Sequence, residues 1–315
     1  MKTGDVIYSA VVPVYNAEST LIELHRRIVE TLEKLGVPFE LIFIDDNSDD
    51  GSWEILRSLR DCDARVRCYQ LMRNFGQQNA TMCGFRQACG RILVSLDDDL
   101  QNPPEEIPLL LAELEQGYDV VFGVYELKRH GLYRRLGSWL INKFYAWTFR
   151  TRGRVSAFRA LRAELAERLL DYDLNFTYIN GLIAWYTERV SRVVVRHESR
   201  NLGQSGYTLR RLLNLSTNMM TNFSLLPLQI ATCAGLLFAS VGFVLGATFV
   251  VRKLAYGSAV SGFTAIIVSI SFFSGMILLF LGIIGEYVGR IHMNINRKPQ
   301  FSIRPEEDHD ERSSS

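Results

Sequence analysis

Short apolar runs alternate with helical patterns along the first 125 residues of the chain. The runs that resemble buried strands are residues 6–12, 40–44, 66–71, 92–96 and 119–124. Apolar residues at helical spacing follow the first three runs at 21–32, 53–59 and 79–89, and Pro104 opens a helix after the fourth. This alternation predicts an α/β fold, with a mostly parallel sheet and helices on both faces.

Two long apolar segments, 228–251 and 263–285, occur in the last third of the chain, and neither contains a charged residue. A helix of about 23 residues reaches roughly 35 Å, enough to cross a hydrocarbon core of about 30 Å. We therefore predict two transmembrane helices; a buried globular hairpin is the alternative. Arg252 and Lys253 lie between the segments, and a larger group of basic residues on the other side favours a cytoplasmic location for both flanks: Arg210, Arg211, Arg290, Arg297 and Lys298.

Two further segments, 132–150 and 208–223, combine basic residues with apolar or aromatic residues at helical spacing. Trp and Tyr favour the membrane–water interface, and Arg and Lys attract anionic head groups. We expect both segments to form amphipathic helices in the interface, although packing on the sheet is the alternative. Arg134 and Ser138 lie one turn apart on the first helix and could bind one phosphate together.

Overall charge and cysteine content exclude little. The chain of 315 residues has a net charge of +1, so it has no general attraction for nucleic acid. The five cysteines form no CxxC pair, which is typical of free thiols in a reducing compartment. Because no secretory signal pattern opens the chain, we expect the N-terminal half to stay in the cytosol.

Three consecutive carboxylates, Asp97, Asp98 and Asp99, follow the fourth predicted strand. If the extended backbone continues for two more residues, Asp97 and Asp99 point to one side and Asp98 to the other. Two close carboxylates raise each other's pKa unless a cation compensates, and oxygen ligands suit Mg²⁺ or Mn²⁺. The triplet therefore indicates a metal site; a solvated acidic loop is the alternative.

The second predicted strand also ends in acids, among them Asp46. Asp46 and Asp97, at neighbouring strand ends, could accept hydrogen bonds from a base or ribose, and Arg73 could bind a phosphate. A role as turn residue or helix cap is the alternative for Asp46. No GxGxxG follows the first strand, which disfavours a dinucleotide-binding Rossmann domain.

Five motifs together resemble the polyisoprenyl-phosphate glycosyltransferases of glycosyltransferase family 2. They are VVPVYN at 11–16, IDDNSDDGS at 44–52, RNFGQ at 73–77, LDDDLQNPPEEIP at 96–108 and GEYVGRI at 285–291. The match covers nearly the whole chain and is similar to bacterial undecaprenyl-phosphate formamidoarabinose transferases and bactoprenol glucosyltransferases. It implies a GT-A fold and metal-dependent, inverting transfer of one sugar from a nucleotide sugar, such as a UDP-sugar, to undecaprenyl phosphate. The product would be a lipid-linked sugar donor for cell-envelope glycan or lipopolysaccharide modification.

The motif positions give a candidate residue for each role. The metal ligands would be Asp97, Asp99 and Gln101, and the catalytic residues Asp97, Asp99 and Arg134. Arg200 and Ser205 would belong to a loop that closes over the donor. The full set of donor-binding candidates is Pro13, Tyr15, Asn16, Asp46, Arg73, Gln77, Asp97, Asp98, Arg200 and Ser205. Contacts to the lipid phosphate would come from Arg134, Ser138, Lys128 and Arg129.

Three positions depart from the family pattern. Tyr125 stands where the family has Arg, so Lys128 or Arg129 would supply that charge, and Gly206 stands where the closing loop has Lys. No carboxylate occurs in 153–156, where the family has an acid often proposed as catalytic. The second pKa of a lipid monophosphate is about 6, so the attacking oxygen is largely deprotonated at neutral pH and needs no general base.

These patterns divide the chain into four parts. Residues 1–131 would form a nucleotide-sugar-binding α/β domain, 132–225 the rest of the catalytic domain, 226–290 a transmembrane hairpin and 291–315 a cytoplasmic tail with a disordered end. The expected protein is multi-pass in the bacterial inner membrane, with its catalytic domain facing the cytoplasm. Family resemblance implies a homo-oligomer in the form of a tetramer, and the near-neutral net charge predicts no nucleic-acid partner. A catalytically silent membrane homologue is the alternative; a processive polysaccharide synthase would need more spans and an RxxRW element.

Overall fold

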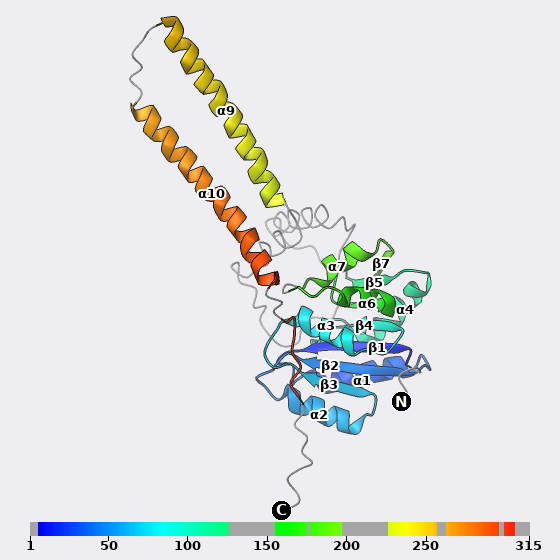
Figure 1. Cartoon of the computed structure of the whole chain (residues 1–315). Coiled ribbons are helices and arrows are strands. Elements are labelled where there is room, and N and C mark those ends of the chain that lie inside the picture. Colours follow the sequence, from blue (N-terminus) through cyan, green and yellow to red (C-terminus); the bar gives the residue numbers. More distant parts are fainter. Residues whose placement is uncertain are drawn as a thin grey trace, which may run out of the picture. The chain divides into compact units, whose positions relative to one another are not determined.

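The chain forms two compact units in the computed structural model (Figure 1), which describes residues 6–125, 155–174, 177–196, 226–256, 263–295 and 299–305. One unit comprises Met1–Gln204 together with Lys298–Ser315, and the other comprises Ser205–Arg297. The first unit holds the predicted α/β fold, and the second holds the two long apolar segments.

A seven-stranded sheet runs through the described part of the first unit in the order β3-β2-β1-β4-β6-β5-β7. Its strands are β1 (Tyr8–Val14), β2 (Phe39–Asp45), β3 (Val66–Gln70), β4 (Ile92–Ser95), β5 (Val120–Val124), β6 (Arg159–Arg162) and β7 (Val190–Val194). The first four pair in parallel, as predicted, whereas β6 runs antiparallel between β4 and β5. Every residue of β2 is buried, as expected for a strand covered on both faces.

Helices cover both faces of this sheet (Figure 1). They are α1 (Leu21–Glu33), α2 (Ser52–Cys62), α3 (Gln77–Gln87), α4 (Ile107–Glu115) after a 3₁₀ turn (Pro104–Glu106), α6 (Ala163–Leu170) and α7 (Ile179–Tyr186). Apolar residues spaced three or four apart on α1, such as Leu24 and Ile28, pack with Val12 and Phe43 of the sheet. Sequence periodicity therefore predicted α1 and its buried face; α2, α3 and α4 were also predicted, whereas α6 and α7 were not.

Helix α3 lies against the opposite face of β1 and β2. A Cβ atom at Gly84 would overlap the side chain of Val11 and would lie 3.4 Å from Ile44 Cγ1. Only glycine allows the helix to approach the sheet this closely. The position of α3 matters because its first residue, Gln77, lies at the carboxyl ends of the parallel strands.

The second unit contains two long helices, α9 (Leu226–Tyr256) and α10 (Phe263–Ile295). Large apolar side chains are exposed along both, for example Phe243 at 79% and Ile270 at 61%, and Phe238 of α9 contacts the ring of Phe272 of α10. Among the described residues, one stretch, Phe272–Gly289, is long and apolar enough to cross a membrane. The apolar part of α9, Leu228–Val244, is shorter, so the second crossing stays a prediction. The predicted interfacial helices at 132–150 and 208–223, and residues 306–315 of the tail, lie outside the described residues.

After α10 the chain returns to the first unit as an extended segment, residues 299–305, which we call the strap. Ile303 forms an antiparallel bridge with Leu71, directly after β3. The amide of Met72 donates to the carbonyl of Ser302 at 2.9 Å, and the amide of Arg304 donates to that of Gln70 at 2.8 Å. The strap therefore adds a short segment to the outer edge of the sheet, which the sequence pattern did not predict.

Candidate active site

The acidic triplet lies in a turn rather than in an extended strand. Strand β4 ends at Ser95, and Leu100 adopts a left-handed conformation with φ 59°. The expectation that extended backbone continues through Asp99 is therefore wrong. Asp98 accounts for the turn, because its Oδ2 accepts the Tyr15 amide at 3.0 Å and its carbonyl accepts the Thr20 hydroxyl at 2.6 Å.

Asp97 and Asp99 nevertheless interact. Burial, and to a smaller extent the negative charge of Asp99, raise the pKa of Asp97 to about 6, while Arg159 opposes both effects. The Gln77 amide donates to Oδ1 of Asp97, and Asn102 Nδ2 lies 3.4 Å from Oδ2. Two carboxylates thus share a volume at the carboxyl end of β4, with one buried arginine acting on Asp97.

Asp98 faces the end of β1 instead. Burial, and to a smaller extent the charges of Asp97 and Asp99, raise its pKa to about 7, against the hydrogen bond from the Tyr15 amide. Its carboxylate therefore joins two loops, those that follow β1 and β4. Tyr15 contributes its backbone to this junction and leaves its side chain 45% exposed at the rim.

Asp46, at the end of β2, joins the β2 loop to the loop after β3. One carboxylate oxygen accepts the Phe75 amide at 2.7 Å, and the other accepts the Gly76 amide at 2.8 Å. Burial raises the pKa of Asp46 to about 6 in spite of these two bonds. In the free protein its carboxylate thus orders the loop that carries Arg73 and precedes Gln77.

The other described donor candidates lie around the same strand ends. Pro13 is part of β1 and pairs with Ile44. Asn16 is left-handed, with φ 53°, and joins the β1 loop to the β2 loop: its amide donates to Ser48 Oγ at 3.0 Å, and its Oδ1 accepts the Asp49 amide at 2.9 Å. The guanidinium of Arg73 stacks on the ring of Phe75, 4.5 Å from its centroid.

Arg159 is a site residue that the sequence patterns did not reveal. It begins β6, is 1% exposed, and donates from Nη1 to Asn180 Oδ1 at 2.6 Å, while its Nε has no partner within the described structure. Burial lowers its pKa to about 10, and the charge of Asp97 opposes that change. The sequence offers only an arginine in a short segment, which does not by itself indicate a site residue. The antiparallel pairing of β6 with β4 places Arg159 opposite Ser95, next to the acidic turn.

Comparison with known proteins identifies the family. The model of "Glycosyl transferase family 2" matches residues 9–170, which include β1 to β6. The chain belongs to glycosyltransferase family 2. It is 34% identical over 304 residues to proteins of Klebsiella pneumoniae and Salmonella paratyphi B, covering 94% of this chain and 92% of each relative. Both relatives are named undecaprenyl-phosphate 4-deoxy-4-formamido-L-arabinose transferase.

Among solved structures, the chain is similar to the glucosyl-3-phosphoglycerate synthase of Mycobacterium tuberculosis. Sequence identity is 21%, the TM-score is 0.48, and the match covers 70% of this chain and 80% of that structure. Family membership makes the protein a glycosyltransferase with a mixed α/β, GT-A-like fold.

The donor set beside β4 fits a hard divalent cation. Asp97 and Asp99 supply carboxylate oxygens, Gln101 follows in the same turn, and the amide oxygen of Asn102 is buried without a partner in the described structure. No group of three or more His, Cys, Asp or Glu side chains in the described ranges forms a ready-made metal cage. Mg²⁺ is commonly held by one or two carboxylates together with substrate phosphates, so this smaller donor set suits a glycosyltransferase of the family.

Ser156, in the segment before Phe158 that contains no carboxylate, bonds to the backbone. Ser156 Oγ lies 2.7 Å from the carbonyl oxygens of both Gly123 and Phe158, so its hydroxyl bonds to the backbone between β5 and β6. Several other predicted residues lie outside the described ranges, namely Lys128, Arg129, Arg134, Ser138, Arg200, Ser205 and Gly206. Their assignment to the lipid phosphate or the donor stays a prediction.

Proposed function

We propose that this protein transfers a single sugar from a UDP-sugar to undecaprenyl phosphate, with Mg²⁺ or Mn²⁺ and with inversion at the anomeric carbon. Two relatives that match 94% of the chain carry this acceptor in their names, which supports the acceptor. The observation that carries the proposal is the interacting pair Asp97 and Asp99 beyond the end of β4. A pair of neighbouring carboxylates is suited to a cation that also binds a diphosphate.

The chemistry follows from charge rather than from proton transfer. A divalent cation held by Asp97, Asp99 and Gln101 would neutralise charge that develops on the departing nucleoside diphosphate. Gln77 and Asn102 orient the Asp97 carboxylate, and Arg73, on the loop ordered by Asp46, would bind a donor phosphate. The lipid phosphate, with a second pKa of about 6, would supply an anionic nucleophile, which agrees with the lack of a carboxylate in residues 153–156.

The remaining parts of the proposal concern the membrane. We infer that both α9 and α10 cross the bilayer, which would make the protein multi-pass in the bacterial inner membrane with its catalytic unit on the cytoplasmic side. Arg134 and Ser138 would then bind the lipid phosphate from an interfacial helix. Assembly as a tetramer rests on family resemblance alone.

A direct assay tests the proposal. The purified full chain is incubated with undecaprenyl phosphate, Mg²⁺ or Mn²⁺ and a panel of nucleotide sugars, and the lipid products are identified by mass spectrometry. We expect one donor, a UDP-sugar, to give undecaprenyl phosphate plus a single sugar residue, and a chelator to prevent the product. A polymeric product would indicate a processive synthase.

A catalytically silent homologue is the second candidate, because residues 153–156 contain no carboxylate where the family resemblance implies an acid. It predicts that donors and lipid still bind while no glycolipid forms with any sugar. A further test concerns the acceptor: Arg134→Ala should raise the KM for lipid phosphate more than the KM for the donor. Equal losses in both would point to a structural role for the helix.

A further inference from the structure

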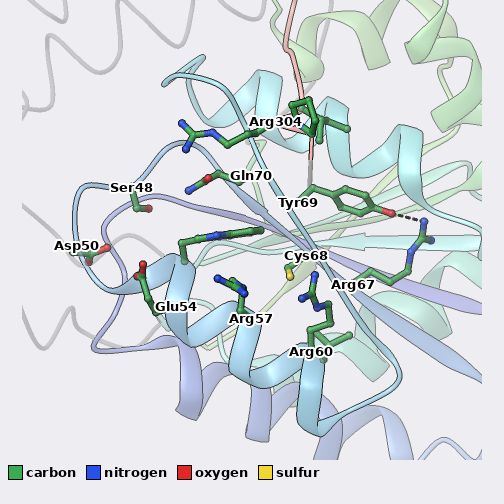
Figure 2. A pocket seen from close by; sticks show the side chains of 14 residues that line it. Ser48, Asp50, Glu54, Arg57, Arg60, Arg67, Cys68, Tyr69, Gln70 and Arg304 are labelled. Carbon is green, nitrogen blue, oxygen red and sulfur yellow. Dashed lines mark hydrogen bonds between the residues drawn. The ribbon is translucent and has the colours of Figure 1, made fainter. Parts of the chain in front are cut away.

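The outer edge of the sheet carries a cavity that the proposed function does not use. It has a volume of about 1110 Å³ and lies between α2, β3 and the strap (Figure 2). Figure 2 shows Arg57 and Arg60 on α2 and Arg304 on the opposite side of the cavity. Four arginines line it, counting Arg67 of β3, against two acids, Asp50 and Glu54. The lining is therefore net positive and suited to an anionic occupant.

The strap ends at the rim of this cavity. Ile303, Arg304 and Pro305 are lining residues, so the next residue of the chain must start beside the arginines. That next stretch is strongly acidic: residues 306–311 read Glu, Glu, Asp, His, Asp, Glu. Covalent continuity and opposite charge both favour the chain's own tail over a separate partner.

The hydrogen bonds of the strap fix the register in which it would continue. Ile303 lies opposite Leu71, and the amide of Leu71 donates inward to Asp45 of β2, whereas Gln70 and Met72 bond outward to the strap. The same antiparallel register places Pro305 opposite Tyr69, a position whose amide points away from β3. Proline, which has no amide hydrogen, therefore costs no ladder bond there.

We propose that residues 306–308 extend the strap along the edge of β3 and bind the arginine-lined cavity through their carboxylates. In this register Glu306 falls opposite Cys68 and Glu307 opposite Arg67. Cys68 belongs to the core face of the sheet, which includes Leu56 of α2. A side chain opposite Cys68 would share that face, so the proposed position would direct Glu306 toward the arginines of α2. Glu307 falls on the other face, where Arg67 already bonds with Glu40 at 2.9 Å.

Binding of the tail would also hold the loop that follows β2. Arg304 Nη2 donates to Asn47 Oδ1 at 3.2 Å, and Asn47, directly after Asp46, is left-handed with φ 59°. Arg304 already bonds to Gln70 of β3 through its backbone. If the residues after Arg304 were also bound, Arg304 would be fixed on both sides and its hydrogen bond to Asn47 would be maintained. The inference does not depend on the proposed function, since it concerns binding within the chain and not turnover.

Hydrogen exchange of the full chain in a neutral detergent tests the proposal. E306Q/E307Q should speed exchange of the β3 amides about fivefold, as the loss of two part-exposed ion pairs would. D310N/E311Q removes the same charge beyond the proposed register and should leave β3 within about twofold of the wild type. Equal acceleration by both pairs, or no change with the first, would overturn the proposal.

Two further measurements identify the occupant. Arg57→Gln removes the proposed partner of Glu306 alone, so it should speed β3 exchange less than E306Q/E307Q does. The combined variant should exchange no faster than E306Q/E307Q, because the Glu306 contact is already lost there. If β3 protection falls on tenfold dilution, the tail comes from a second copy and the proposal is wrong. It is also wrong if protection appears only after anionic lipid is added to the detergent.

Discussion

The ends of β2 and β4 carry similar acids in different surroundings. Asp46, after β2, has both carboxylate oxygens bonded to backbone amides of one loop. Asp97, after β4, faces another carboxylate, two side-chain amides and the buried Arg159. Burial raises the pKa of both acids to about 6, so the pKa alone does not separate them. Each also has a nearby acid, Asp45 for Asp46 and Asp99 for Asp97, so the difference lies in their hydrogen bonds. Two backbone amides of one loop bond to Asp46, which indicates a role in loop structure, whereas side-chain amides bond to Asp97, which suits cation binding.

Asp99→Asn should give the largest effect. Asparagine keeps the oxygen that accepts the Gln101 amide at 3.1 Å, so the turn should stay folded, but the negative charge is lost. We expect glycolipid formation to fall by at least about 100-fold, as for loss of a major electrostatic contact in a transition state. Mass-spectrometric product assays and thermal unfolding of the same sample measure both properties. Unchanged turnover would remove Asp99 from the metal site.

Asp46→Asn should act on folding instead. One of the two amides that Asp46 binds, from Phe75 or Gly76, would face an NH₂ group and lose its acceptor. We expect the free energy of unfolding to fall by about 2 kcal/mol, the cost of a buried donor left unpaired. Urea unfolding of the full chain in detergent measures it. A variant as stable as the wild type but inactive would assign Asp46 to the donor rather than to the loop.

Gln77→Ala sharpens the difference between the two strand ends. Gln77 orients Asp97 and has no role at Asp46, so its loss should weaken Mn²⁺ binding about tenfold, as for other residues that orient metal ligands. Titration calorimetry measures the affinity. Gln87→Ala, at the far end of the same helix, is the matched control and should bind Mn²⁺ as the wild type does.

The pH dependence of stability should show the smallest effect. The pKa of Asp46 is about 6 in the folded protein and near its ordinary value of 3.8 in the unfolded chain, so the folded state binds more protons between these values. Its contribution to stability is complete below about pH 4 and is lost as the pH rises through 6. The difference in unfolding free energy, wild type minus Asp46→Asn, should therefore fall by on the order of 1 kcal/mol across that window. A constant difference would contradict the shift.

Much of the catalytic unit follows from local pattern. Strands β1 to β5 and the helices between them were predicted because apolar runs and helical spacing repeat in order, and the acids at their ends were predicted with them. The turn at Asp97 was not, since its shape depends on bonds from Tyr15 and Thr20, about 80 residues earlier. Patterns of neighbouring residues cannot predict hydrogen bonds between residues so far apart in the sequence.

The residues missed by sequence reasoning share this dependence on distant contacts. Strand β6 contains two arginines in four residues and does not resemble a buried strand, so neither its antiparallel pairing nor the burial of Arg159 was predicted. The strap has no periodicity and gains its structure from Leu71 and Met72, more than 200 residues away. Both features affect the strand ends at which the acids lie.

Gly84 has a practical consequence for anyone engineering this protein. Replacing glycine in the middle of a helix with alanine is a common way to raise thermal tolerance. Here the added methyl group would push α3 away from Val11, and Gln77 at the start of that helix would move with it. Gly84→Ala would thus favour the helix but displace Gln77, seven residues earlier, from Asp97. Screens for stabilising substitutions should therefore leave Gly84 unchanged.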